Sequence, residues 1–300
     1  SATKTAGGSG QSQGGNIARY NTLTGERTRL VKPSWRPRYL QYEDSILITR
    51  GDTTERPSRD VERRLADLRA RQRADSAELD MRWNWNTPFL LSPHNPDVLY
   101  AGANRVMKST QRGDNLYPIS PDLSKKQMAK IDTSMNKTGG ITLDATGAET
   151  YGTIVALAES FVRPGFLWAG TDDGNVWFTR NDGAMWEPVP ANRFPGLPSG
   201  DVYVARIEPS HYDSLTAYVA FDNHRWNDFN PYVYVTTNGG RTFRSIASNL
   251  PTGGIDNLHV IREDPLNRDG LYVGAWRGVY VSLYRGQSWQ RVMAGPPTTP

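Results

Sequence analysis

The segment TTNGGRTF at residues 236–243 decides the fold of this chain, because it recurs three times in altered form. The copies read TRNDGAMW at 179–186, SLYRGQSW at 282–289 and, more loosely, STQRGDNL at 109–116. All four begin with a hydroxyl residue and carry Gly at the fifth position, and three end in an aromatic residue. Because Gly adopts a positive φ without the cost that a Cβ brings, the pattern predicts a tight turn between two strands, with the closing side chain turned inward.

The positions within these turns have separate roles. A polar side chain at the third position, such as Asn181 or Asn238, can accept hydrogen bonds from turn amides, whereas Tyr284 cannot fold back in this way. We interpret the turns as structural elements. The residues assigned to them are Ser109, Gly113, Thr179, Asn181, Gly183, Trp186, Thr236, Asn238, Gly240, Phe243, Ser282, Gly286 and Trp289.

The turns start at residues 109, 179, 236 and 282, so they are 70, 57 and 46 residues apart. Each belongs to a unit that reads as four short strands, and the units cover residues 84–120, 152–190, 202–248 and 257–293. Small antiparallel sheets repeated in this way are typical of β-propeller blades. The sequence therefore predicts an all-β fold, a β-propeller of four-stranded antiparallel blades.

The number of blades stays open at this point. Residues 16–31 predict a hairpin, which is half a blade. Together with the four units this gives about five blades, or six if the following segment supplies strands, for example at residues 45–49. An incomplete ring that a partner closes is the third alternative.

Residues 58–80 have a different sequence pattern from the strand-and-turn units. They contain neither Gly nor Pro, and apolar residues follow at helical spacing after Ser58, a suitable N-cap. We expect one α-helix inserted into a single propeller domain that spans residues 16–300. The Gly/Ser-rich residues 1–15 predict a flexible tail. The helix either lies solvated on the propeller or is a docking arm, in which case its interface candidates are Arg63, Arg64 and Arg71.

Four further segments carry a resemblance to a known family: WNWNTP at 83–88, SPHNP at 92–96, GTDDGNV at 170–176 and VIREDP at 260–265. With the turns, they resemble the Asp-box, or BNR-repeat, propellers of the sortilin type, including bacterial glycosyl-hydrolase-like proteins and photosystem assembly-factor propellers. The resemblance runs from about residue 15 to residue 300. It implies that the turns lie on the outer rim, away from the ligand-binding face. The family has Asp at the third turn position, where this chain has Gln111, Asn181, Asn238 and Tyr284.

Composition narrows the classes of function. The 300 residues carry a net charge of +4 without a Lys/Arg block, so nucleic acid is not an expected partner. No run of eighteen apolar residues predicts a membrane span, and the absence of Cys leaves the redox compartment open. The chain starts at Ser1, which fits a removed leader or a fragment. Because the family that it resembles is commonly exported, we expect a periplasmic or extracellular protein, peripheral to the membrane.

The titratable residues give weak signals for catalysis. Glycoside hydrolysis needs two carboxyl groups about 5–10 Å apart, and the weak candidates are Asp172, Asp173, Asp222 and Asp228. The first two stand in a sequence that is typical of a turn. The four His residues lack the spacing of a metal site, and no Gly-rich loop joins a strand to a helix. We therefore predict neither a metal nor a cofactor.

The hairpin at residues 221–232 is the most informative surface segment. Its aromatic and Arg residues are of the types enriched at protein interfaces, and aromatic residues beside Asp and Asn also suit stacking on sugars. A third alternative is that the hairpin covers its own blade. The interface candidates are Arg225, Trp226, Phe229 and Tyr232.

Three hypotheses for function follow. The first is a non-catalytic propeller that acts as a scaffold, a membrane-extrinsic subunit that holds or stabilises a larger membrane complex. The resemblance to photosystem assembly factors makes a photosynthetic complex one candidate for that membrane complex. The alternative is a glycoside hydrolase or polysaccharide-binding propeller, and the third hypothesis is an unrelated enzyme. Other protein subunits are the expected partners under the first hypothesis, and carbohydrate is the expected ligand under the second.

Overall fold

The computed structural model describes residues 17–30, 45–46, 48–51, 58–79, 81–134, 139–142, 150–254 and 256–292. The chain divides into two compact units, one of Val31–Met81 and one of Ser1–Leu30 with Arg82–Pro300. The flexible tail predicted for residues 1–15 lies outside the described residues.

The smaller unit contains helix α2 (Arg59–Leu79), in the stretch where the sequence predicts a helix. The Ser58 hydroxyl accepts a hydrogen bond from the Val61 amide at 3.4 Å, as an N-cap does. The prediction of a strand at residues 45–49 is wrong, because residues 45–46 and 48–50 are helical. There the Thr49 hydroxyl donates to the Ser45 carbonyl, four residues back, at 2.7 Å. A short apolar run does not distinguish a strand from a helix by periodicity alone.

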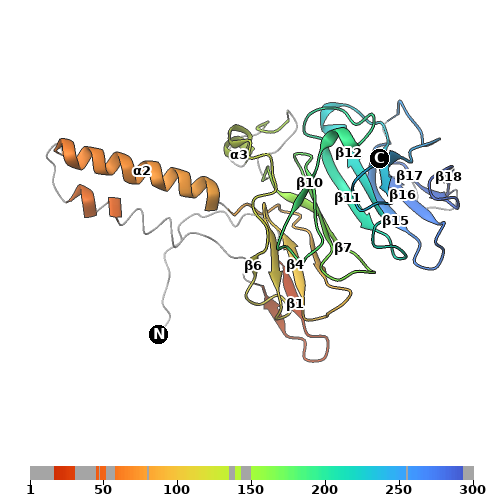
Figure 1. Cartoon of the computed structure of the whole chain (residues 1–300), viewed down its shortest axis with the longest axis horizontal. Helices are drawn as coiled ribbons and strands as arrows, with labels where there is room; N and C mark the ends of the chain where they lie inside the picture. Colours follow the sequence, from red (N-terminus) through yellow and green to blue (C-terminus); the bar gives the residue numbers. More distant parts are fainter. Residues whose placement is uncertain are drawn as a thin grey trace. The chain divides into compact units, whose positions relative to one another are not determined.

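The larger unit contains four sheets, each of four antiparallel strands that pair in chain order. Figure 1 shows these sheets side by side, from β4 and β6 through β7, β10 and β11 to β15–β18. Sheet 1 contains β3 (Phe89–Leu91), β4 (Leu99–Gly102), β5 (Val106–Ser109) and β6 (Tyr117–Pro118), and sheet 2 contains β7 (Ile154–Glu159), β8 (Leu167–Thr171), β9 (Val176–Thr179) and β10 (Glu187–Val189). Sheet 3 contains β11 (Tyr203–Pro209), β12 (Ala217–Asp222), β13 (Tyr232–Thr236) and β14 (Arg244–Ser245), and sheet 4 contains β15 (Leu258–Glu263), β16 (Leu271–Ala275), β17 (Gly278–Ser282) and β18 (Gln290–Arg291).

This topology places the loops at two opposite edges of the sheets. The edge at the top of Figure 1 is called the upper edge, and it holds the segment before the first strand of each sheet and the loop between the second and third strands. The lower edge holds the loops between first and second strands and the recurring turns. Helix α3 (Met128–Ser134) and the 3-10 helix η2 (His224–Trp226) belong to the upper edge, and the 3-10 helix η1 (Ala191–Arg193) follows β10.

The core of the described sheets lies between neighbouring sheets, where buried apolar residues form clusters. Small residues allow the close approach: a Cβ on Gly102 would lie 2.8 Å from Cγ2 of Ile154 in sheet 2, and one on Gly170 would lie 2.3 Å from Cγ1 of Val204 in sheet 3. The second strands of sheets 1, 2 and 3 each contribute a buried aromatic residue. These residues are Tyr100, Trp168 and Tyr218. Each sheet is therefore stabilised mainly by the apolar face of its neighbour.

The four recurring turns join third to fourth strands at the lower edge. In each turn the first hydroxyl, on Ser109, Thr179, Thr236 or Ser282, accepts a hydrogen bond from the amide of the glycine four residues later, at 2.9 to 3.1 Å. These glycines have φ between 81° and 100°. Asn181 and Asn238 accept a further amide hydrogen bond at 2.9 Å. The closing side chains are buried, and they are Leu116, Trp186, Phe243 and Trp289.

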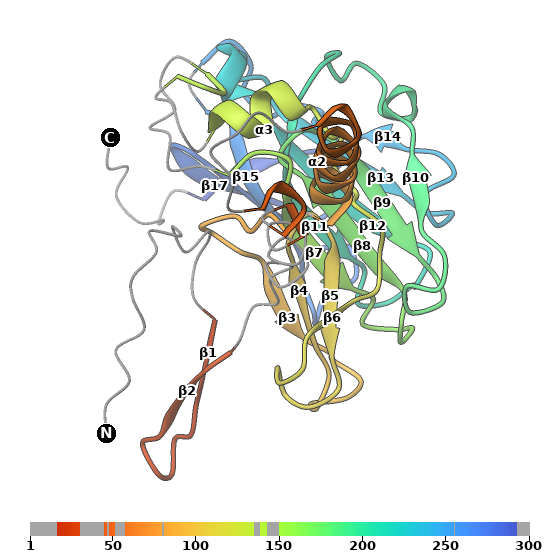
Figure 2. The same cartoon turned by 90° about the vertical axis from the view of Figure 1, so that its left-hand side faces the viewer.

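A two-stranded ribbon, β1 (Ala18–Tyr20) and β2 (Arg27–Arg29), precedes the four sheets in the larger unit (Figure 2). Arg19 attaches it to the first recurring turn, since the Arg19 guanidinium donates to the Asp114 carboxylate at 3.2 Å and to the Arg112 carbonyl at 3.1 Å. A polar cavity of about 760 Å³ lies between this ribbon and the lower edge of sheet 1.

Candidate functional site

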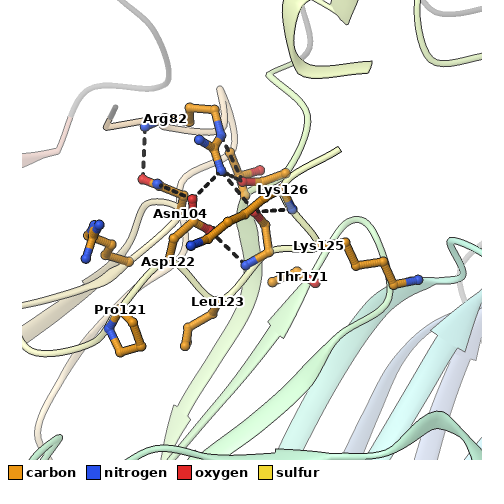
Figure 3. Close-up of polar contacts among 12 residues, drawn as sticks. Arg82, Asn104, Pro121, Asp122, Leu123, Lys125, Lys126 and Thr171 are labelled. Atoms are coloured by element: carbon orange, nitrogen blue, oxygen red, sulfur yellow. Dashed lines mark hydrogen bonds and ion pairs between the residues drawn. The ribbon is translucent and has the colours of Figure 1, made fainter. Parts of the chain in front are cut away.

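A buried ion pair anchors the upper edge of sheet 1 (Figure 3). The Arg82 guanidinium donates to the Asp122 carboxylate at 2.8 Å and to the Gly152 carbonyl at 3.1 Å. The Asn104 amide group donates to Asp122 at 2.9 Å and accepts from the Arg82 backbone amide at 3.0 Å. Burial alone would raise the pKa of Asp122, but the charge of Arg82 and the hydrogen bonds from Asn104 and Ser124 outweigh it and hold the pKa below its ordinary value. The pair therefore stays ionised, and its hydrogen bonds join four separate parts of the chain.

The adjacent carboxylates Asp172 and Asp173 occupy the upper turn between β8 and β9, as the sequence predicts. The Thr153 amide donates to Asp172 at 2.8 Å, and the Lys125 amide donates to Asp173 at 2.7 Å. Both side chains are buried, and burial raises the pKa of each, with the Asp173 charge adding to the effect on Asp172. Their geometry braces the loops of sheets 1 and 2.

Asp201 fixes the segment around helix α3 to the loop that precedes β11. Its carboxylate accepts from the Lys125 ammonium at 3.0 Å and from the Tyr151 hydroxyl at 2.7 Å, and it also pairs with Lys130. Although burial opposes ionisation, the hydrogen bonds from Lys130, Tyr151 and Lys125 lower the pKa of Asp201 strongly. The Trp226 indole donates to the Asp201 carbonyl at 3.2 Å. No pattern in the sequence indicates this group, because its members come from positions up to 101 residues apart (125 to 226).

Asp222, at the end of β12, lies between two His side chains. Its carboxylate is 2.8 Å from Nδ1 of His224 and 3.4 Å from Nδ1 of His259, and the Asn257 amide donates to it at 2.8 Å. Burial would raise the pKa of Asp222, but the hydrogen bonds and charge of His224 lower it. The His259 ring also lies 5.9 Å from the ring of Trp276. This cluster combines a buried carboxylate, two part-exposed imidazoles and an exposed indole.

The fourth carboxylate candidate, Asp228, does not join this cluster. It accepts from the Asn223 amide at 2.8 Å and from the Tyr232 hydroxyl at 2.7 Å. Burial opposes these hydrogen bonds, but they lower the pKa of Asp228 and tie the carboxylate within its own hairpin. Asp222 and Asp228 are thus held by separate sets of partners.

Among the described tryptophans, three are more than half exposed, and all three lie in upper-edge segments. The exposed fractions are 64% for Trp85 before β3, 51% for Trp226 between β12 and β13, and 52% for Trp276 between β16 and β17. The other interface candidates of the hairpin, Phe229 and Tyr232, are half-buried. The exposed aromatic surface of the upper edge is therefore spread over three sheets, whereas the sequence drew attention to one hairpin.

The remaining interface candidates are Arg225 in the hairpin and three arginines of helix α2. Arg225 places its guanidinium 5.1 Å from the ring of Tyr203. In the smaller unit, Arg63 pairs with Asp60 at 3.3 Å, Arg71 pairs with Asp67 at 3.0 Å, and Arg64 is exposed. Their role at an interface stays a prediction.

Two glutamates form an acidic group at the lower edge of sheets 3 and 4. Glu208 pairs with Arg262 at 2.5 Å and with Arg206 at 3.3 Å, while Glu263 accepts from the Tyr218 hydroxyl at 3.0 Å. Burial raises the pKa of Glu208 to about 7, the Glu263 charge adds to the rise, and Arg206 opposes it. Both glutamates stand at the end of a first strand, and nothing in the local sequence indicates that the two side chains approach each other.

Among the described residues, no three His, Asp or Glu side chains come together as a group that could hold a metal ion. No helix there has the length and apolar character that crossing a membrane requires.

Comparison with known proteins identifies the fold class. An ancestral GH74 enzyme has a similar structure, with 19% sequence identity, 70% of this chain and 24% of that chain covered, and a TM-score of 0.51. A GH74 xyloglucanase from Xanthomonas campestris gives 15% identity, 71% and 29% coverage, and a TM-score of 0.50. YCF48 bound to a D1 peptide gives 18% identity, 46% and 39% coverage, and a TM-score of 0.35, too low to support an argument. No protein-family model matches, and no curated protein matches.

The likeness shows the fold alone. This chain spans less than a third of the length of each GH74 enzyme. The predicted class, four-stranded antiparallel sheets in a propeller-like arrangement, is confirmed. The number of blades and the closure of a ring stay predictions.

Proposed function

We propose that this protein is a non-catalytic interaction module that holds other protein subunits through its upper edge. The observation that carries the proposal is the exposure of Trp85, Trp226 and Trp276 along that edge. Trp is among the residues that contribute most to binding at protein interfaces, because a large apolar ring is removed from water when the partner binds.

The surroundings of the carboxylates support a non-catalytic role. Asp172 and Asp173 are buried and accept hydrogen bonds from backbone amides of neighbouring loops. Asp222 and Asp228 have separate hydrogen-bond partners. Glycoside hydrolysis requires a carboxyl pair that faces a bound sugar. In this protein the four candidates stabilise loops, which leaves them poorly placed for a shared reaction.

The resemblance of the sequence to exported propellers extends the proposal to location and partner. We infer that the protein works in the periplasm or outside the cell, against the surface of a membrane complex whose subunits it holds. A photosynthetic complex is one assembly of that kind. Turns without the Asp of the family, such as the one with Tyr284, are compatible with this role because the role requires of the turns only that they stabilise the sheets.

The test uses two variants of the full chain. In Trp85→Ala/Trp276→Ala, crosslinking in native cells followed by mass spectrometry must lose a protein subunit that the wild type captures repeatedly. The matched control is Leu266→Ala at the lower edge, where the side chain is 95% exposed, and this variant must retain the same subunit. Urea unfolding of all three proteins checks that the fold is intact. Retention of the subunit by the double Trp variant would refute the proposal.

One observation favours the second candidate, a glycan-binding or glycan-cleaving propeller. Trp276, His259 and Asp222 combine an exposed ring with a polar cluster, which suits a sugar stacked on the indole. A panel of polysaccharides that includes xyloglucan tests this candidate by release of reducing ends and by retarded migration in glycan-containing gels. Hydrolysis that falls at least 100-fold in Asp222→Asn would replace the scaffold proposal. Retarded migration without hydrolysis, lost in Trp276→Ala, would assign glycan binding to the upper edge.

A further inference from the structure

Two arginines hold one carboxylate oxygen between them at the lower edge. The guanidinium of Arg262 donates to Oε2 of Glu208 at 2.5 Å, and the guanidinium of Arg206 donates to the same oxygen at 3.3 Å. Arg206 and Glu208 stand on β11 of sheet 3, whereas Arg262 reaches the carboxylate from β15 of sheet 4. The two arginines therefore form a carboxylate-binding pair across the boundary between two sheets.

The packing of the first strands does not require these charges. Glu208 pairs with Tyr218 in β12, and Arg262 pairs with Tyr272 in β16, so the two residues occupy the same position in successive sheets. In sheet 2 that position, which pairs with the buried aromatic residue of β8, holds Ala158. Since the fold accepts a small apolar residue there, the charged group has a use other than joining the sheets.

Glu208 itself is poorly suited to remain ionised in this place. Burial raises its pKa to about 7, Arg206 opposes the rise, and the charge of Glu263 adds to it. The other titratable groups beside the carboxyl are His211, whose Nε2 lies 3.9 Å from Oε1, and Tyr218, whose hydroxyl donates to Glu263 at 3.0 Å. Near neutral pH the carboxyl group is therefore about half protonated, which weakens its attraction for the arginines.

The arginines stay accessible although the carboxylate that they hold is buried. The side chains of Arg206 and Arg262 are 31% and 47% exposed, whereas that of Glu208 is 4% exposed. Each guanidinium uses one nitrogen for Glu208, and the buried Nε of Arg206 has no hydrogen-bond partner among the described residues. A guanidinium can make two parallel hydrogen bonds to a carboxylate, so donors remain for a second acceptor.

An exposed apolar surface adjoins this arginine pair. The ring of Phe161, in the lower loop of sheet 2, stacks on the imidazole of His211 with 3.9 Å between ring centroids and an interplanar angle of 14°. Phe161 is 42% exposed, and its neighbour Val162 is 47% exposed. Because the same imidazole faces Glu208, a ligand bound by the arginines would lie beside these apolar side chains.

We propose that Arg206 and Arg262 bind a carboxylate of an acidic peptide segment in a partner protein, and that Glu208 competes for the same site from within the chain. The resident carboxylate shows which chemistry the pair accepts. Two arginines that face Glu208 and Glu263 carry little net positive charge, which favours a monovalent carboxylate over a phosphate dianion. An apolar residue beside the acid packs on Phe161. This site lies at the edge opposite the exposed tryptophans and does not depend on the role proposed for them.

Competition by Glu208 has a consequence for the pH dependence of binding. As the pH falls from 8 to 6, Glu208 takes up a proton and releases the arginines, whereas glutamates of a free peptide stay ionised. The peptide must therefore bind at least about fivefold more tightly at pH 6 than at pH 8. His211 is the other group beside the carboxyl whose charge can change, so a variant of Glu208 must separate the two contributions.

The probe is a rhodamine-labelled peptide with two adjacent glutamates between leucines, and its control has glutamines in their place. Fluorescence anisotropy with the full chain must show saturable binding of the glutamate peptide alone. Arg262→Gln must weaken binding at least about tenfold. Arg268→Gln removes the same charge from an exposed arginine of the lower edge and must leave binding unchanged. Phe161→Ala must weaken binding at least about threefold, and urea unfolding of each variant checks the fold.

The variant Glu208→Gln tests the competition by a gain of binding, which a folding defect cannot imitate. It must bind the peptide at least about threefold more tightly than the wild type at pH 8, and its affinity must change less than about twofold between pH 8 and pH 6. Retention of the wild-type pH dependence in this variant overturns the competition.

Three further outcomes overturn the proposal. They are the absence of saturable binding, equal binding of the glutamate and glutamine peptides, and calorimetric binding of sulfate without binding of the peptide, which would assign the arginines to a small anion. Trp85 and Trp276 are unchanged in all these variants, so the upper-edge proposal stands or falls by its own test.

Discussion

The guanidinium of Arg82 and the carboxylate of Asp122 form an ion pair at 2.8 Å in which each side chain is only 2% exposed. They are 40 residues apart in the sequence and close the upper edge of sheet 1 over the loop at Gly152. Taking two charges out of water is costly, so this pair is tolerated because hydrogen bonds from Asn104 and Ser124 complete its surroundings.

Removal of one partner of this pair is expected to be strongly destabilising. In Asp122→Asn the Arg82 charge stays buried without its counterion, and the free energy of unfolding should fall by about 3–5 kcal/mol. Urea unfolding followed by Trp fluorescence measures the change. The matched control is Asp97→Asn, which breaks the exposed pair with Arg112 at 2.6 Å and should leave the unfolding curve nearly unchanged. Similar urea unfolding curves for Asp122→Asn and Asp97→Asn would contradict the conclusion that the buried pair is needed for stability.

Gly240 should tolerate a methyl group poorly because of packing and not only because of its φ of 86°. A Cβ there would lie 2.9 Å from Phe178 and 3.0 Å from Trp168 in sheet 2. Gly240→Ala is expected to lower the free energy of unfolding by about 1–3 kcal/mol more than Gly196→Ala. Gly196 has a similar φ of 76° and nothing within 4 Å of the added Cβ. Equal losses in thermal unfolding would remove the packing explanation.

The hydroxyl of Thr236 should be needed for the turn that follows it. In Thr236→Val the shape is conserved, but the Gly240 amide loses its acceptor at 3.0 Å in a buried place. An unsatisfied buried amide costs about 1–3 kcal/mol, so the midpoint of urea unfolding should shift accordingly. As a control, Thr24→Val in the exposed turn of β1–β2 allows water to replace the hydroxyl and should have little effect. An unchanged midpoint of urea unfolding in Thr236→Val would contradict the role of this hydroxyl in the turn.

The raised pKa of Glu208, about 7, predicts a pH dependence of stability. Between the ordinary pKa of a glutamate and about 7, the folded protein binds the proton more tightly than the unfolded chain. The stability from this group is full below pH 4 and is lost as the pH rises through 7. The total loss is about 3 kcal/mol, since one pKa unit corresponds to about 1.4 kcal/mol.

Unfolding free energies measured between pH 4 and 8 check this sign. Glu208→Gln should flatten the curve in that range because the amide does not titrate. Glu187→Gln, at a side chain with 41% exposure, is the matched control and should keep the wild-type slope. A wild-type curve that rises from pH 5 to pH 7.5, with no effect of Glu208→Gln, would be incompatible with the prediction.

Much of the fold could be predicted because its signals are local. A turn such as residues 236–243 depends on a hydroxyl, a glycine and a closing aromatic residue within eight positions, and the hydrogen bonds that shape it lie within the turn itself. The four predicted units therefore coincide with the four sheets. The strand predicted at residues 45–49 is wrong because a run of five residues is too short for its pattern to distinguish a helix from a strand.

The candidate site was less predictable. Asp172 and Asp173 could be placed in a turn from their sequence, but their burial comes from Thr153 and Lys125 in other loops. The exposure of Trp85 and Trp276 also depends on which loops cover them, and no spacing in the sequence states that. The residues of the upper-edge site can therefore be identified only from the tertiary structure, in which the loops of neighbouring sheets meet.

The sequence by itself determined where the chain turns, because backbone φ and short-range hydrogen bonds are set by residues a few positions apart. Only the tertiary structure decided which charges are buried and which apolar side chains stay exposed. Burial, desolvation and the pKa values that follow from them depend on atoms contributed by distant segments, as the buried pair of Arg82 and Asp122 shows.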